Sequence, residues 1–137
     1  MSSFKIFEVA GTGMSAQSVR LNTTASNLAN ADSISGDPSK VYRAKHPLFE
    51  AIRTGLGTNS ATSGVAVRGI VEAEAPPTAR YEPGNPLADT NGYVYAPNVN
   101  TVEEMVDMIS ASRSFQNNVE VMNTAKEMMF ATLRLGQ

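Results

Sequence analysis

The sequence predicts an α+β fold: long N- and C-terminal helices paired as a coiled-coil-like core, with a small β-rich domain inserted between them. Both ends of the 137-residue chain lack proline, and apolar or small residues recur there at alternating spacings of four and three. All seven prolines lie between residues 32 and 98, together with short strand-like runs. We therefore expect three parts: an N-terminal helix in 1–31, a β-rich insertion in 32–98 and a C-terminal helix in 99–137.

The first helix is expected over residues 3–31. Its repeat consists of Phe4, Phe7, Gly11, Met14, Ser18, Leu21, Ala25 and Leu28. Several of these residues are small, and Gly11 and Gly13 each cost about 1 kcal/mol relative to alanine inside a helix. Glycine is useful there if another backbone approaches closely. After Glu8 only Arg20 is charged before Asp32, so we expect neighbours on more than one side of this helix.

The middle of the chain has the composition of short strands and turns. Residues 65–71 are rich in β-branched side chains, and Asn91-Gly92 before Tyr93 is a hairpin signal. Residues 55–64 form a polar stretch typical of a loop tip. We expect this β unit at the far end of the helix pair.

The second helix is expected over residues 101–135. Asn100 and Thr101 are candidate caps, and Thr101 with Glu104 fits a capping box. A second repeat consists of Met105, Met108, Ser112, Phe115, Val119, Met122, Lys126, Met129 and Leu133. Ile109 and Phe130, with Val106, widen this stripe beyond a two-stranded seam. The pattern predicts a contact surface between subunits.

The residues that carry most enzyme chemistry are scarce. Cysteine is absent, His46 is the only histidine, and neither glycine pair has the context of a phosphate loop. The net charge of −2 gives no basic surface for nucleic acid. We therefore expect no catalytic, cofactor or metal site and no small-molecule substrate.

The N-terminus lacks the layout of a signal peptide, and no run of about 20 apolar residues could span a bilayer. These features predict a chain that is either cytosolic or exported without cleavage.

Residues 24–33 read TASNLANADS, with a core of Asn27, Leu28, Ala29 and Asn30. This run resembles the N-terminal signature of flagellar axial proteins, the rod and hook family. The run from Pro97 to Gln137 is similar to the family's terminal helix, and residues 81–94 resemble the short rod members. One departure is the polar insertion 37–40, where most members have a Thr-x-Gly-aromatic turn.

The resemblance implies a structural subunit that the flagellar type III apparatus exports uncleaved. It would join copies of itself, other rod proteins and the membrane-ring or rod-adaptor region, forming a hollow periplasmic drive shaft. That shaft would transmit torque and conduct exported subunits. The terminal helices would form the inner tube and the β unit would lie outside. The sequence leaves open whether that unit touches the surrounding bushing rings.

The subunit interface predicted from both repeats is one set of helical positions. It consists of Phe4, Phe7, Gly11, Met14, Leu21, Ala25, Leu28, Met105, Met108, Ile109, Phe115, Val119, Met122, Met129, Phe130 and Leu133. The alternatives are a component of another helical secretion or tail tube and a soluble coiled-coil adaptor. The Asn-Leu-Ala-Asn core argues against the first. The lack of charges beside the first seam argues against the second.

Overall fold

The computed structural model describes residues 3–53 and 63–135, and it confirms the α+β class. The elements in chain order are α1 (Ser3–Ala29), β1 (Lys45–Arg53), β2 (Ser63–Glu72), β3 (Thr78–Tyr81), β4 (Tyr93–Ala96) and α2 (Thr101–Leu135). Both helices end within two residues of their expected limits. The polar stretch 55–64 lies almost entirely outside the described residues.

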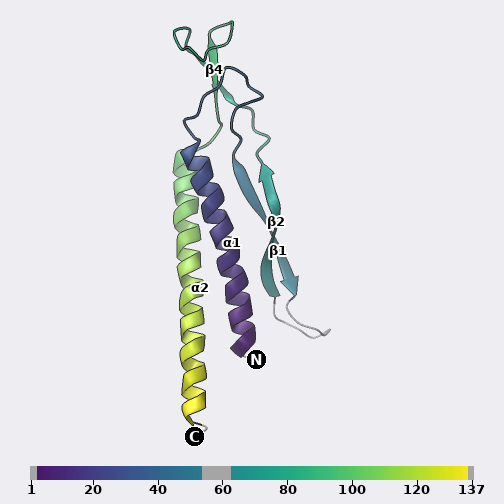
Figure 1. The fold of residues 1–137 in the computed structure, drawn as a ribbon, viewed down its shortest axis with the longest axis vertical. Coiled ribbons are helices and arrows are strands. Elements are labelled where there is room, and N and C mark those ends of the chain that lie inside the picture. The colour runs from purple at the N-terminus through teal and green to yellow at the C-terminus, as the bar shows by residue number, and fades with distance from the viewer. Residues whose placement is uncertain (1–2, 54–62, 136–137) are drawn as a thin grey trace.

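The two helices lie side by side and antiparallel (Figure 1). At 1.5 Å per residue, α1 is about 40 Å long and α2 about 52 Å. The C-terminal end of α2 consequently projects beyond the start of α1 (Figure 1). Among the described residues, no helix is both long and apolar enough to span a bilayer.

The contact between α1 and α2 uses small and polar residues. Those buried on the two helices are Ala10, Ala16, Thr23, Thr24, Asn27, Glu104, Ala111 and Ala125. On α2 the buried positions recur at intervals of seven and fourteen residues, as a face turned toward one partner helix requires. Between them lies Asn118, whose side chain reaches Gly13 so closely that a Cβ there would lie 3.0 Å from Asn118 Oδ1.

The predicted repeat on α2 only partly coincides with this inner face. Met108, Phe115, Met122 and Met129 are half-buried, whereas Met105 and Lys126 are exposed. The buried positions Glu104, Ala111 and Ala125 each lie one residue before a predicted one. Small side chains let the helices approach closely, which leaves the larger apolar side chains beside the contact rather than inside it.

The strands form two antiparallel pairs, β1 with β2 and β3 with β4. The expectation that the whole β unit lies at the far end of the helices is wrong for the first pair. The β1–β2 hairpin folds back along α1, on the side opposite α2 (Figure 1). Only β3 and β4 extend beyond the helix ends.

The segment between α1 and β1 is fastened to β4. Ser35 and Tyr95 exchange backbone hydrogen bonds of 2.9 and 2.8 Å. Gly36 lies directly against the carbonyl of Leu87, where a side chain would collide with backbone. The expected turn at Asn91-Gly92 forms, with Gly92 at φ 81°, but it precedes β4 within an eleven-residue connection instead of joining two strands directly.

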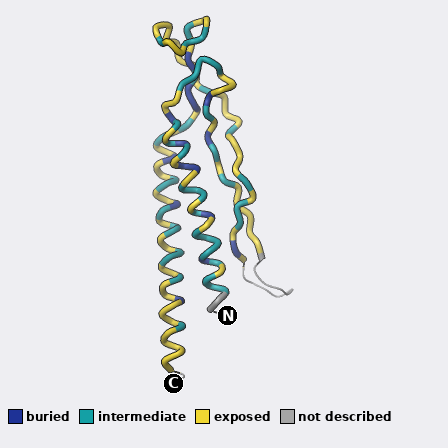
Figure 2. The backbone as a smooth tube through the Cα atoms, in the orientation of Figure 1, coloured by how far each residue is buried: buried dark blue, intermediate teal, exposed yellow. Residues whose placement is uncertain are grey.

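The hydrophobic core is made of small side chains. Every buried hydrophobic residue in the described part is alanine or valine, and the largest fully buried side chains are Val94 and Asn27. Figure 2 shows buried positions as isolated points along the helices rather than one continuous block. In the described part, the single chain therefore leaves many large apolar side chains exposed.

Candidate assembly surfaces and the polar junction

Asn27 joins three elements through one side chain. Its amide nitrogen donates to the Lys45 carbonyl (3.0 Å) and to Glu104 Oε1 (2.9 Å). Its amide oxygen accepts from the Lys45 backbone N–H (2.8 Å) and the Tyr42 hydroxyl (2.9 Å). With two donors and two acceptor sites in use, the amide of Asn27 has its full set of partners. It connects α1 with α2 and with the start of β1.

Tyr42, in the segment before β1, also contacts Ser26, the residue that precedes Asn27 on α1. Because its hydroxyl donates to Asn27, its 3.0 Å contact with Ser26 Oγ is one in which Ser26 donates. The Lys45 ammonium lies 5.8 Å from the centre of the Tyr42 ring, a cation–π distance. We call the group Ser26, Asn27, Tyr42, Lys45 and Glu104 the polar junction.

Glu104 is the charged member of the junction and is only 6% exposed. Burial raises the pKa of its carboxyl above the ordinary value, against the opposing effects of the Asn27 hydrogen bond and the nearby His46. Asp107 and Glu103 on the same helix raise the pKa further. The predicted capping box is wrong: Asn100 Oδ1 caps α2 by accepting from the N–H of Val102, and Glu104 turns to Asn27 instead.

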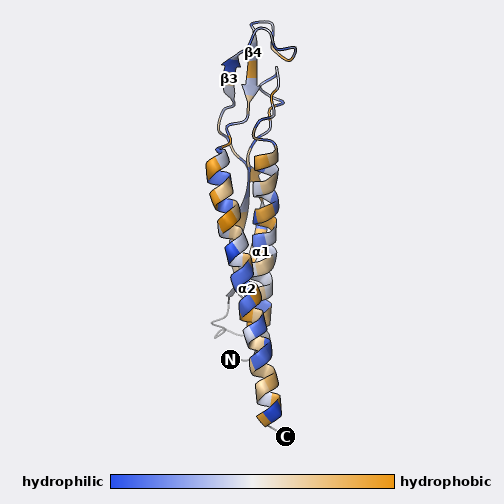
Figure 3. Ribbon diagram, turned by 90° about the vertical axis from the view of Figure 1, so that its left-hand side faces the viewer, coloured by the Kyte–Doolittle hydropathy of each residue, from blue (hydrophilic) through white to orange (hydrophobic). Residues whose placement is uncertain are grey.

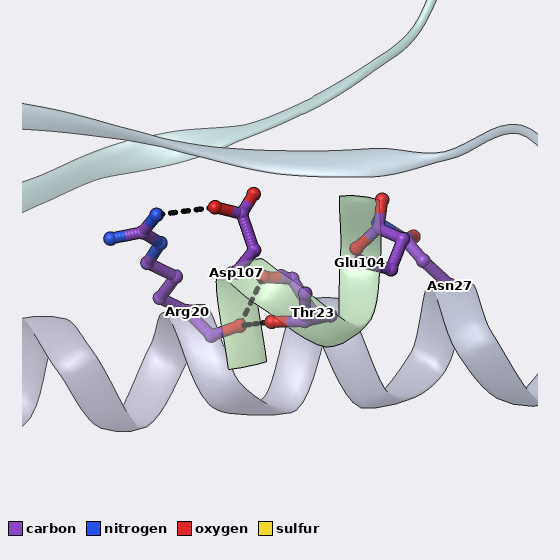
Figure 4. Close-up of polar contacts among 6 residues, drawn as sticks. Arg20, Thr23, Asn27, Glu104 and Asp107 are labelled. Atoms are coloured by element: carbon purple, nitrogen blue, oxygen red, sulfur yellow. Dashed lines mark hydrogen bonds and ion pairs between the residues drawn. The ribbon is translucent and has the colours of Figure 1, made fainter. Parts of the chain in front are cut away.

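A salt bridge lies beside the junction (Figure 4). Arg20 on α1 contacts Asp107 Oδ1 on α2 at 2.7 Å, with both side chains partly exposed. Between α1, β1 and the start of α2 is an open polar hollow of about 350 Å³, lined by Arg20, Lys45, His46 and Glu104 among others. His46 lies at the start of β1. No group of three or more potential metal ligands occurs in the part of the chain that the structure describes.

The predicted interface residues divide by exposure. Those that are exposed are Ala25, Met105, Ile109, Phe130 and Leu133. Those that are half-buried are Phe7, Gly11, Met14, Leu21, Leu28, Met108, Phe115, Val119, Met122 and Met129. Phe4 belongs to α1, but its side chain lies outside the described part. Within the signature, Asn27 is buried, Leu28 and Asn30 are half-buried, and Ala29 is exposed.

The predicted interface set left out several exposed apolar residues of α2. These are Val102, Val106, Val121, Met128 and Leu135, with exposed fractions from 47% to 87%. Together with the exposed predicted residues, they place exposed apolar residues from the first turn of α2 to its last, and the ribbon in Figure 3 shows hydrophobic positions along this helix. An open apolar groove of about 410 Å³ lies near the C-terminal end of α2, between Ile6 and Met128.

Sequence reasoning also missed the junction partners Tyr42 and Glu104. The sequence held one usable signal for Glu104, which lies one residue before the apolar repeat. Glu104, Ala111, Asn118 and Ala125 recur every seven residues, the spacing of one helix face. No local pattern links Asn27 to Lys45, which lies eighteen residues away.

A slender chain with an alanine-rich core and apolar helix surfaces is typical of a subunit that assembles with other chains. Comparison with known protein families identifies its class. Residues 7–33 match the family model described as flagella basal body rod protein. Residues 90–135 match the model described as flagellar basal body rod FlgEFG protein C-terminal.

Comparison with individual proteins narrows this class. Over the full length of both chains, the protein is 53% identical to the flagellar basal-body rod protein FlgC of Salmonella typhimurium. It is equally similar to that of Escherichia coli O157:H7 and 52% identical to that of Yersinia enterocolitica, again over complete chains. The chain belongs to the FlgC family of flagellar basal-body rod proteins.

Family membership confirms the predicted class of function. The chain is a structural rod protein of the bacterial flagellar basal body and not an enzyme. This assignment argues against the two alternatives predicted from the sequence, another secretion or tail tube and a soluble adaptor. Which residues touch which neighbour stays a prediction.

Proposed function

We propose that this chain assembles helically, with copies of itself and other rod proteins, into the proximal part of a hollow periplasmic rod. In this proposal α1 and α2 form a coiled-coil-like pair in the tube wall, and the strands of the β-rich insertion lie outside. The rod-adaptor region at the membrane ring is the neighbour at the base. The tube transmits torque and conducts exported subunits. The family and the exposed apolar helix surfaces support this assignment.

The observation that carries the proposal is the amount of surface that the single chain exposes. A compact monomer of this mass would expose about 6,900 Å², by the usual scaling with molecular mass. The chain exposes 9399 Å². The excess of about 2,500 Å² is on the order of three standard contact patches of ~800 Å² each. Several neighbours around each subunit would cover such a surface.

Charge placed on the exposed apolar face of α2 tests this proposal. Val106 is 60% exposed and Ile109 54%, so Val106→Asp and Ile109→Asp remove little packing from the single chain. In an assembled wall each would place an uncompensated charge in an apolar contact. Thr78→Asp adds the same charge to exposed β3, on the proposed outer side, and serves as the matched control.

Cells carrying either α2 substitution should express the subunit, lack it in purified basal bodies and fail to swim. Cells with Thr78→Asp should swim normally. Normal basal-body content with both α2 substitutions would remove the claim that this face is a subunit contact.

We also propose that the chain reaches the rod without cleavage of its N-terminus. The support is structural, because α1 begins at Ser3 and the segment around Phe7 belongs to the helix that packs on α2. Intact-mass measurement on purified basal bodies should give the full 14.6 kDa chain. A mass lower by the ~15–30 residues of a signal peptide would contradict this part of the proposal.

A further inference from the structure

We infer that the polar junction fixes the orientation of the β1–β2 hairpin relative to the helix pair, with Asn27, Tyr42 and Glu104 as the positioning residues. The inference concerns the geometry of the single chain and is independent of where that chain sits in the rod. It follows from how Asn27 binds β1 and from how few polar bonds otherwise join the described part of the hairpin to α1.

Asn27 binds the first residue of β1 as a neighbouring strand would. Its amide both donates to the carbonyl and accepts from the N–H of Lys45, at 3.0 and 2.8 Å. Lys45 pairs with Glu72 of β2 on its other side. Two hydrogen bonds from one planar amide restrict rotation as well as translation, so the base of the hairpin has a defined direction relative to α1.

Beyond the junction, the hairpin contacts α1 by packing along both strands and by one exposed hydrogen bond. Farther along the hairpin, the Val65 N–H donates to Thr12 Oγ1 at 3.2 Å, in exposed surroundings. Large apolar side chains of the hairpin stay in water, among them Leu48, Phe49, Ile70 and Val71, each more than 40% exposed. An isolated two-stranded hairpin is marginally stable in water. Its direction therefore depends chiefly on the attachment at its base.

Glu104 and Tyr42 hold Asn27 in the rotamer that binds Lys45. Glu104 accepts the second amide hydrogen from the α2 side, and Tyr42 donates to the amide oxygen from the segment before β1. Loss of either partner leaves a buried polar group of Asn27 without one of its bonds, which favours other orientations of the amide. The angle of the hairpin relative to the helix pair is thus set by the bonds of one side chain, Asn27.

Distance measurements between spin labels test this inference. The described residues contain no cysteine, and the sequence has none anywhere, so introduced cysteines are the only labelling sites. One labelled pair, Glu50→Cys with Gln116→Cys, joins exposed positions of β1 and α2 and reports the hairpin direction. A second pair, Ser18→Cys with Gln116→Cys, joins the two helices and reports their pairing.

Each pair is measured by pulsed electron paramagnetic resonance in the full-length chain, alone and with Tyr42→Phe or Glu104→Ala. Tyr95→Phe is the matched control, because it removes a hydroxyl that bonds Asp89 at 3.3 Å, away from the junction. The unmodified junction should give one narrow distance peak for each pair. With Tyr42→Phe or Glu104→Ala, the distance distribution of the hairpin pair should broaden, while that of the helix pair should stay narrow. Tyr95→Phe should change neither distribution.

Three results would overturn the inference. One is a narrow hairpin peak that survives both junction substitutions. Another is broadening of both pairs together, which would show general loss of structure. The third is a broad hairpin peak in the chain with an intact junction, which would show that the junction does not fix the hairpin at all.

Discussion

The side-chain amide of Asn27 on α1 donates a 2.9 Å hydrogen bond to Glu104 on α2, and both residues are buried, at 1% and 6% exposure. The two lie 77 positions apart in the chain, at the end of one helix and the start of the other. Among the described residues, Asn27 and Val94 are the largest side chains buried almost completely. A polar amide therefore occupies a place that an aliphatic side chain fills in most small domains.

Replacing Asn27 should destabilise the chain far more than replacing the other asparagine of the signature. Asn27→Ala leaves the backbone of Lys45, the Tyr42 hydroxyl and Glu104 without a buried partner, and we expect a loss of about 3 kcal/mol in the free energy of unfolding. Among the described residues, the side chain of Asn30 bonds only the Ser26 carbonyl at the end of α1, so Asn30→Ala should cost about 1 kcal/mol or less. Urea unfolding of both variants measures the difference. Equal losses in the two variants would show that the hydrogen bonds of Asn27 in the junction add no more to the free energy of unfolding than the single bond of Asn30 does.

Glu104 should make stability depend on pH in a defined direction. Because burial raises the pKa of Glu104, the folded chain binds this proton more tightly than the unfolded chain does. Above the folded-state pKa, the buried carboxylate is ionised and lowers the free energy of unfolding by the whole cost of burying its charge. That cost falls as the pH drops toward the ordinary value of 4.5.

Glu104→Gln isolates this effect, because the amide oxygen can still accept from Asn27. At neutral pH the variant should be at least as stable as the original chain, and its advantage should shrink as the pH falls through the folded-state pKa. Urea unfolding at a series of pH values gives the comparison. The opposite result is an original chain that is more stable than Glu104→Gln at neutral pH and loses this difference on acidification. It would show that folding lowers the pKa of Glu104 instead of raising it.

Gly11 and Gly13 should respond differently to alanine. Both lie inside α1, where alanine is favoured over glycine by about 1 kcal/mol. A Cβ at Gly11 meets nothing within 4 Å, whereas one at Gly13 would lie 3.0 Å from Asn118 Oδ1. Gly11→Ala should therefore stabilise the chain, and Gly13→Ala should gain less or nothing because Asn118 must move. Identical thermal stabilisation of the two variants would contradict the close approach of α2 at Gly13.

The sequence was sufficient to predict both helices, because proline-free ends with a 4-3 repeat have few other interpretations. It failed on which face meets the partner helix. Counting apolar residues selects large side chains such as Met105, while two closely packed helices bury small ones such as Ala111. The fold-back of the hairpin was also unpredictable, since it depends on a side-chain amide pairing with the backbone of Lys45 eighteen residues away.

The candidate surfaces were only partly accessible to sequence reasoning. The stripe through Ile109 and Phe130 was recognised, and both side chains are exposed in the single chain. Val106 was treated only as widening that stripe, and Val121 fell outside the repeat altogether. A rod wall can cover several sides of a helix at once, so a single heptad-like seam describes too narrow a surface.

Cryo-electron microscopy of purified basal bodies tests the central claim most directly. If α1 and α2 form the wall of the rod, Val106 and Ile109 should be packed against a helix of a neighbouring subunit, and the β1–β2 hairpin should lie on the outer side. Density that leaves both side chains facing solvent or the central channel, with no neighbouring chain against that face of α2, would contradict it.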